Sequence, residues 1–276
     1  MVSPTEPTDA IPGATLDMAR MPGHWLLARM GKRVLRPGGL ELTRRMLDGL
    51  AITAGDAVVE FAPGLGVTAR LVLERQPLAY TGIERDEAAA ANVRRLLTNP
   101  AYRCLIGTAE ETGLESASAS VVFGEAMLTM HTPGQKARIV REAYRILKPG
   151  GRYGIHELSL IPDTVSETVK EMVMRDLSAA IHVGARPLTS SEWRAVLEAE
   201  GFQVQAEFAA PMHLLEPKRM VQDEGLGRAL RILFNIARTP AARQRILAMR
   251  KVFRTHAAHL AAIALVAVKP ATQETV

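Results

Sequence analysis

The sequence predicts an α/β protein built on a doubly wound, mostly parallel sheet, and three observations support this fold class. From residue 57 onward, short β-branched runs alternate with longer helical ones, which is the pattern of repeated βαβ units. The first of these runs, Ala57–Phe61, leads directly into a turn that contains two glycines. A content of 47% hydrophobic residues in 276 positions is sufficient for a large core.

Seven strands are predicted, with helices in most of the intervals between them. We expect strands near residues 57–61, 79–84, 102–106, 120–124, 152–158, 202–208 and 260–268. Helices are expected at 67–75, 86–97 and 134–147, and a fourth begins at the capping-box sequence Thr189–Glu192. Asp86 is the expected N-cap of the second helix. Lys148–Gly151 ends the third, because a proline and paired glycines do not continue a helix.

The segments outside this alternation predict the organisation of the chain. Residues 1–22 are expected to be a mobile N-terminal arm, because they contain three prolines and lack the pattern of a secretory signal. Residues 23–276 are expected to form one domain, in which 23–50 supply cap helices before the first strand. Residues 162–186 and 217–256 are longer than normal connections, so we expect them to be helical insertions.

Cysteine usage and hydropathy limit the class of protein. The single cysteine, Cys104, excludes an internal disulfide and a cysteine metal cluster, and we expect no metal site. The longest apolar stretch is shorter than the roughly 20 residues that a membrane-spanning helix needs. These features predict a cytoplasmic protein.

The net charge of +5 is concentrated in one segment. Pro217–His256 contains ten Lys or Arg and two acidic residues, so its charge is +8 and the rest of the chain sums to −3. Arginines alternate there with apolar residues, which predicts two basic amphipathic helices around Thr239–Pro240. Four interpretations remain open: a solvated face, attraction of an anionic acceptor, contact with an anionic membrane surface, or a subunit interface such as that of a homodimer.

The turn after the first strand, Glu60–Gly66 (E-F-A-P-G-L-G), is predicted to bind a ligand. Gly64 and Gly66 allow positive φ or a close approach of the backbone to that ligand. The carboxylate of Glu60 favours a cationic ligand and disfavours a pyrophosphate. The turn also matches the dinucleotide pattern G-x-G-x-x-[GA], and Glu84 lies 20 residues after Gly64, so NAD(P) is an alternative cofactor.

From Ala57 to Val268 the sequence resembles the class I S-adenosylmethionine-dependent methyltransferases. Glu60–Gly66 resembles that family's E/D-x-G-x-G-x-G turn, and Gly82–Glu84 resembles the acid after its second strand. Arg141–Gly151 (R-E-A-Y-R-I-L-K-P-G-G) resembles its helix-to-strand signature. Within the family, the ubiquinone and menaquinone biosynthesis type is the nearest in appearance, also over Pro187–Phe202. The resemblance implies a Rossmann-like, seven-stranded fold, S-adenosylmethionine as the cofactor, and methyl transfer as the activity (EC 2.1.1).

The resemblance also implies which residues hold the methyl donor. Glu84 would accept hydrogen bonds from the ribose hydroxyls, for which an ionised carboxylate is suited. Two positions depart from the family pattern: Ala62 stands where the first glycine is usual, and Thr108 where an aspartate often lies near the adenine amine. The expected cofactor-binding residues are Glu60, Ala62, Gly64, Gly66, Glu84, Thr108, Ala109 and Glu125.

Candidate catalytic residues follow two neighbouring strands. In an open α/β sheet the ligand lies outside the carboxyl ends of the strands, which directs attention to Glu125 and His156 as general bases. The alternatives are a buried, hydrogen-bonded histidine for His156 and a residue that holds a helix N-terminus for Glu125. His131 precedes Thr132–Pro133, and we interpret it as a loop residue beside a helix start.

The acceptor is predicted to be a small molecule, apolar or phenol- or quinone-like. No Asn-Pro-Pro-Tyr tetrapeptide follows the fourth strand, and only 4% of residues are aromatic, so we expect no nucleic-acid partner. Apolar residues at helical spacing in 163–183 predict a lid over the acceptor. Two alternative functions remain open: an NAD(P)-dependent reductase, and a protein that binds S-adenosylmethionine without turnover.

Overall fold

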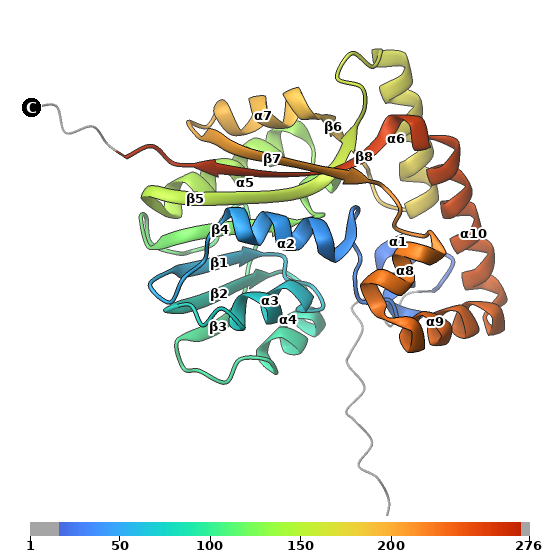
Figure 1. The fold of residues 1–276 in the computed structure, drawn as a ribbon, viewed down its shortest axis with the longest axis horizontal. Helices are drawn as coiled ribbons and strands as arrows, with labels where there is room; N and C mark the ends of the chain where they lie inside the picture. The colour runs from blue at the N-terminus through green and yellow to red at the C-terminus, as the bar shows by residue number, and fades with distance from the viewer. Residues whose placement is uncertain (1–16, 272–276) are drawn as a thin grey trace, which may run out of the picture.

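The computed structural model describes residues 17–271, and its centre is one mixed sheet. The strands are β1 (Ala57–Phe61), β2 (Ala79–Glu84), β3 (Tyr102–Ile106), β4 (Ala119–Glu125), β5 (Leu147–Leu160), β6 (Leu188–Thr189), β7 (Gln203–Pro211) and β8 (Leu260–Val268). Their order is β3-β2-β1-β4-β5-β8-β7, and β6 pairs separately with β5. Only β8 runs antiparallel to its neighbours, β5 and β7 (Figure 1). The predicted doubly wound, mostly parallel sheet is confirmed.

Helices separate the first five strands except between β3 and β4, and further helices follow in the second half of the chain. The helices are α1 (Gly23–Arg29), α2 (Gly39–Gly49), α3 (Val67–Leu73), α4 (Glu87–Arg94), α5 (Pro133–Ile146), α6 (Glu167–Ile181), α7 (Ser190–Glu198), α8 (Pro217–Glu224), α9 (Leu226–Arg238) and α10 (Pro240–Thr255). Two short 3₁₀ helices are η1 (Leu128–Met130) and η2 (Ala257–His259). Asp86 caps α4, and Thr189 caps α7 in a capping box, as the sequence predicts.

Two apolar layers cover the sheet. On one face, α5 and α7 pack against the strands and bury Ile139, Trp193 and Leu197. On the other face, α2, α3 and α4 bury residues such as Leu42 and Val72 against β1, β2 and β4. Near-continuous burial along β1, β4 and β5 is what a parallel sheet covered on both faces requires.

A third apolar cluster lies beyond one end of the sheet, where α1, α6, α8, α9 and α10 gather (Figure 1). Helix α6 comes from the predicted lid insertion, and α8 to α10 come from the basic insertion. The two basic helices predicted around Thr239–Pro240 are α9 and α10, and the insertion contains a further helix, α8, before them. The helices bury one another through Val173, Ile232 and Met249, so these insertions form a core of their own beside the sheet.

Three further details differ from the sequence prediction. The sheet has an eighth strand, the two-residue β6, which is too short to leave a period-two pattern. Strand β5 begins at Leu147 and so includes Lys148–Gly151. The expected arm over residues 1–22 also differs at its end, because Met21 is fully buried and its carbonyl accepts from Arg245 Nη1 at 2.7 Å. The remainder of that arm, residues 1–16, lies outside the described residues.

Candidate active site

A cavity of about 390 Å³ opens at the carboxyl ends of β1, β2, β3 and β4. This is the edge of an open α/β sheet at which ligands bind. Its polar end is formed by the segments that follow these four strands, and its apolar end is formed by α1, α6 and α10. One continuous space therefore joins a site suited to a polar ligand with a chamber suited to an apolar one.

The turn after β1 has the backbone conformation that the sequence predicts. Gly64 and Gly66 have φ of 56° and 72°, and Ala62 has φ of 51° although it carries a Cβ. Ala62 thus adopts the left-handed conformation that a glycine adopts more readily. A Cβ at Gly66 would lie 2.7 Å from Leu96 Cδ1, which is the mobile end of a half-buried side chain, so the main requirement for glycine here is its φ of 72°. Ala62 and Gly64 line the cavity, whereas Gly66 lies behind it as the N-cap of α3.

Glu84 is fixed at the end of β2 by backbone donors. Its Oε2 accepts from Gly64 N at 3.0 Å, and its Oε1 accepts from Arg85 N at 2.9 Å and Asp86 N at 3.1 Å. The side chain lines the cavity although the residue is only 5% exposed. A carboxylate has about four lone-pair sites, so these three bonds leave capacity for a hydroxyl donor. The rigid acceptor fits a ribose.

The segment after β3 forms the wall next to Glu84. Thr108 and Ala109 both line the cavity, as does Glu110 beside them. The backbone of Gly107 donates to Glu84 O at 3.0 Å, which holds this segment against the end of β2. Thr108 and Ala109 thus line the same cavity as Glu84, and Thr108 carries a hydroxyl where the family resemblance implies a carboxylate.

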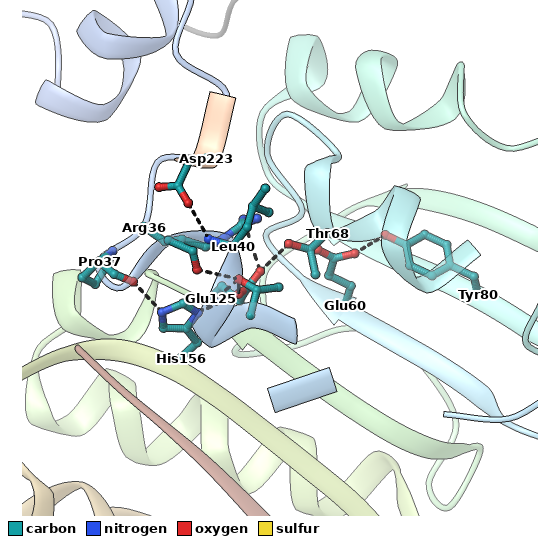
Figure 2. Close-up of polar contacts among 11 residues, drawn as sticks. Arg36, Pro37, Leu40, Glu60, Thr68, Tyr80, Glu125, His156 and Asp223 are labelled. Atoms are coloured by element: carbon teal, nitrogen blue, oxygen red, sulfur yellow. Dashed lines mark hydrogen bonds and ion pairs between the residues drawn. The ribbon is translucent and has the colours of Figure 1, made fainter. Parts of the chain in front are cut away.

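The side chain of Glu125 is 6% exposed and contacts residues of three other elements and of the Arg36 loop (Figure 2). Its Oε1 accepts from Thr43 Oγ1 of α2 at 2.5 Å and contacts His156 Nδ1 of β5 at 2.7 Å. Its Oε2 accepts from Thr68 Oγ1 of α3 and lies 3.2 Å from Arg36 Nη1. All of its acceptor capacity is therefore used by the protein itself.

The pKa of Glu125 follows from these partners. Burial opposes ionisation, but the Arg36 guanidinium and the hydrogen bonds from His156 and Thr43 outweigh it and lower the pKa to about 2. A carboxylate with such a low pKa accepts a proton poorly at neutral pH. Glu125 lines the cavity, yet its geometry favours holding charge and structure over proton transfer.

His156 lies behind Glu125 and does not line the cavity. The residue is fully buried, and its Nε2 lies 2.6 Å from Pro37 O while its Nδ1 lies 2.7 Å from Glu125 Oε1. Both ring nitrogens face protein acceptors, so neither is free to take a proton from a bound molecule. The buried, hydrogen-bonded alternative describes this geometry better than a base that reaches an acceptor.

Glu60 is placed differently from the expectation that its carboxylate faces the ligand. It is 3% exposed, does not line the cavity, and accepts from Tyr80 Oη at 2.6 Å. Burial raises the pKa of Glu60 to about 8, because the hydrogen bond from Tyr80 does not compensate for the lost hydration and Glu125 lies nearby. The side chain is therefore mostly protonated at neutral pH, and Figure 2 shows it directed toward the Tyr80 hydroxyl of β2.

Arg36 is a functional candidate that the sequence analysis missed. It lines the cavity and is 9% exposed, and its Nη1 pairs with Glu125 while Nε and Nη2 have no partner among the described residues. A buried guanidinium with free donors is costly unless a ligand supplies acceptors. No motif marks this residue in the sequence, because the loop that carries it is placed only by tertiary contacts.

Those contacts come from the end of α8, 183 or more residues away along the chain. Asp223 Oδ1 accepts from Leu40 N at 3.0 Å (Figure 2), and Glu224 Oε1 accepts from Arg33 N and Val34 N, each at 2.8 Å. Two carboxylates of the basic insertion thus hold both ends of the loop that presents Arg36. The insertion is a structural part of the site.

The chamber beyond Arg36 is lined mainly by apolar side chains. They are Trp25, Leu27, Leu35, Met127, Met130, Ile139, Leu158, Leu177, Ile181, Met212, Leu214, Met249 and Phe253. Two of them, Leu177 and Ile181, belong to the stripe in α6 that predicted a lid. His24 also lines the chamber, and burial together with the charge of Arg85 lowers its pKa to about 4, so its imidazole is neutral. Such a lining suits an apolar molecule.

His131 is the second histidine that lines the cavity, beside His24, and a hydrogen bond fixes its orientation. Its Nδ1 lies 2.9 Å from Met127 O, so Nδ1 carries the proton and donates to that carbonyl. Nε2 has no hydrogen-bond partner among the described residues, and the side chain lines the cavity. The sequence analysis interpreted His131 as a loop residue, and it does lie between η1 and α5. Only the fold places it at the cavity.

Two further findings concern membrane-spanning helices and metal sites. Among residues 17–271, no helix has the length and apolar character needed to cross a bilayer. Within the same range, no cluster of three or more His, Cys, Asp or Glu side chains has an arrangement that would hold a metal ion.

Comparisons with known proteins agree with this site. Residues 59–155 match a methyltransferase domain family. An uncharacterized protein of Haemophilus influenzae is 30% identical over 237 residues, which cover 84% of this chain and 91% of that protein. The methyltransferase phqN of Penicillium fellutanum is 26% identical over 73% of this chain and 64% of its own length.

Solved structures of similar fold include two with different activities. The [4+2]-cyclase SpnF superposes with a TM-score of 0.68 at 17% identity, covering 89% of this chain and 92% of that chain. Phosphoethanolamine N-methyltransferase 2 of Haemonchus contortus, in complex with S-adenosyl-L-methionine, gives a TM-score of 0.66 at 17% identity, covering 90% of this chain and 57% of that chain.

Four observations agree on the class of protein: the fold, the glycine turn, the acidic residue after β2 and the match to a methyltransferase domain. Residues 59–155 form a methyltransferase domain, and the chain has the fold of the class I S-adenosylmethionine-dependent methyltransferases. Its cofactor is S-adenosylmethionine, which decides between the two cofactors that the turn sequence left open. The comparisons do not single out the ubiquinone and menaquinone type.

Proposed function

We propose that this enzyme transfers the methyl group of S-adenosylmethionine to a small, apolar acceptor such as a phenol or quinone derivative. The observation that carries this proposal is the continuity of the polar site at Glu84 with the apolar chamber between α1, α6 and α10. Methyl transfer needs the donor and acceptor aligned in one space from which water is excluded. A chamber lined by Leu, Met, Ile and Phe selects an apolar acceptor.

The donor-binding set fits the groups that S-adenosylmethionine presents. Glu84 receives a ribose hydroxyl on its free acceptor capacity, and Thr108 and Ala109 border the adenine. Ala62 and Gly64 offer the backbone of the turn, while Gly66 and Glu60 support that turn from behind. Arg36 is the group that we assign to the donor's carboxylate, because its free guanidinium donors require an anion. The bound donor supplies the electrophilic methyl group.

His131 is the residue that we assign as the general base for a protic acceptor. Its Nε2 has no partner among the described residues, and the bond from Nδ1 to Met127 O leaves Nε2 as the nitrogen that can accept a proton. Glu125 and His156, the candidates from the sequence, are assigned positioning roles instead. They hold Arg36 and the loop of Pro37 against the sheet, so their removal would misplace donor groups without removing a proton acceptor.

The test combines labelled donor with a His131 variant. Wild-type protein incubated with methyl-labelled donor and a cell extract is expected to put label into an apolar small-molecule fraction. The His131→Gln variant should lose roughly 10²- to 10⁴-fold in kcat while its donor affinity stays unchanged. His213→Gln, an exposed histidine that does not line the cavity, is the matched control.

Two results would overturn the proposal. Label in RNA or protein would contradict the small-molecule acceptor. Donor binding with no labelled product from any fraction would show that the protein binds the donor without turnover. Unchanged kcat in His131→Gln would contradict only the assignment of His131 as the base.

A further inference from the structure

The outer face of α9 exposes large apolar side chains to solvent. Leu226, Leu230, Leu233 and Phe234 are between 46% and 63% exposed. At 100° per residue these four lie on one side of the helix, whereas the buried residues Ala229 and Ile232 lie on another. The helix is therefore apolar on two faces, and only one of them is covered by this chain.

Neighbouring helices extend this apolar patch. Leu247 of α10 is 54% exposed, and Val221 of α8 is 41% exposed. Helix α9 packs against both α8 and α10 in the helical group beside the sheet (Figure 1). Most of the large exposed apolar side chains of the described chain thus belong to three consecutive helices, and single scattered ones would need no explanation.

The charge around the patch has one sign. Residues 225–256 contain eight Lys or Arg and no Asp or Glu. Arg228 and Arg250 approach carboxylates of α8 or its N-cap, but the exposed Arg231, Arg243 and Lys251 form no ion pair within residues 17–271. A partner for this surface must therefore supply both apolar volume and negative charge.

We propose that this surface of α9, extended by Leu247, docks on an anionic lipid bilayer. Leucine and phenylalanine side chains would enter the boundary between headgroups and acyl chains, and the arginines and Lys251 would meet lipid phosphates. A second copy of the chain is a poorer occupant, because it would bring two uncompensated basic surfaces together. The bilayer supplies apolar volume and anions at the same place.

Docking in this way brings the acceptor chamber to the membrane surface. Asn235 of α9 donates to Met30 O at 3.0 Å, just before the loop that carries Arg36. Helix α10, which packs on α9, lines the chamber with Met249 and Phe253. This consequence rests on the proposed function: an apolar acceptor dissolved in lipid would reach the chamber without crossing bulk water.

Vesicle co-sedimentation tests the surface independently of activity. We expect wild-type protein to pellet with vesicles of phosphatidylglycerol and phosphatidylcholine at low salt, and to release as salt rises or when phosphatidylcholine is used alone. The double variant Leu230→Ser/Phe234→Ser should bind roughly tenfold or more weakly, because two inserted apolar side chains are lost. Arg231→Gln/Arg243→Gln should reduce binding mainly at low salt.

Leu78→Ser is the matched control, because Leu78 is 64% exposed at the start of β2, away from the helical group. Circular dichroism checks that each variant keeps its fold. The proposal is overturned if wild-type protein stays in the supernatant with anionic vesicles at low salt, or if Leu78→Ser weakens binding as much as the double variant. A concentration-dependent dimer that Leu230→Ser/Phe234→Ser abolishes would identify a second copy as the occupant and would also overturn it.

Discussion

Replacing Glu60 by Gln tests the statement that this carboxyl is protonated in the folded protein. Burial raises its pKa from 4.5 to about 8, so the folded state binds a proton that the unfolded state releases above its ordinary pKa. The direction in which stability changes with pH follows from this difference in proton binding. The stabilising contribution is fully present below pH 4.5 and is lost as the pH rises through about 8.

The magnitude follows from proton linkage. Between pH 5 and pH 7 one group with these two pKa values reduces the free energy of unfolding by roughly 2.5 kcal/mol. Gln is neutral at every pH, has nearly the same shape, and its carbonyl oxygen still accepts from Tyr80. In Glu60→Gln this part of the pH dependence should therefore be absent, and the variant should gain stability relative to wild type as the pH rises.

Urea unfolding at pH 5, 6, 7 and 8 measures the effect as the difference between wild type and variant. Glu115→Gln, at an exposed glutamate, is the control and should leave the pH dependence unchanged. A difference between wild type and Glu60→Gln that stays constant over this range would refute the reasoning, because it would mean that Glu60 is ionised in the fold.

Three other substitutions give separate predictions. Glu84→Gln should raise the calorimetric Kd for S-adenosylhomocysteine roughly 10- to 100-fold, since it removes a charged acceptor, and Glu115→Gln should not. Glu125→Gln should cost about 3–5 kcal/mol in urea unfolding because Arg36 stays buried without its carboxylate. Wild type should lose the stability that ionised Glu125 contributes as the pH falls through about 2, and Glu125→Gln should not show this loss. Asp223→Ala should lower the free energy of unfolding by about 1–3 kcal/mol and weaken donor binding several-fold. Asp48→Ala, at an exposed position, is the control and should do neither. Unchanged donor affinity in Asp223→Ala would show that α8 does not help to form the site.

The sequence by itself determined the parts of this protein that depend on short-range chemistry. Strand and helix positions follow from β-branched runs and capping residues such as Asp86, whose effects extend over one turn. The turn at Gly64–Gly66 is predictable because positive φ restricts the residue type. Glu84 is predictable as a cavity residue because the end of a parallel strand opens to the ligand edge.

Only the tertiary structure decided how the charges are distributed. The sequence predicts that the carboxylate of Glu60 faces a ligand, but burial beside Tyr80 makes this side chain neutral. The sequence predicts Glu125 and His156 as general bases. In the structure, contacts with Thr43, Arg36 and the Pro37 carbonyl occupy their polar atoms. A pKa depends on hydration and on charges a few ångströms away, which sequence spacing does not specify.

The same reason explains why Arg36 and the contribution of α10 to the chamber were not predicted, although the apolar stripe of α6 was. The loop of Arg36 is held by Asp223 and Glu224, and the bond from Leu40 to Asp223 spans 183 residues. His131 and the α10 side chains reach one cavity from distant parts of the chain. Local patterns identified the elements, whereas the packing of one element against another determined which side chains share a site.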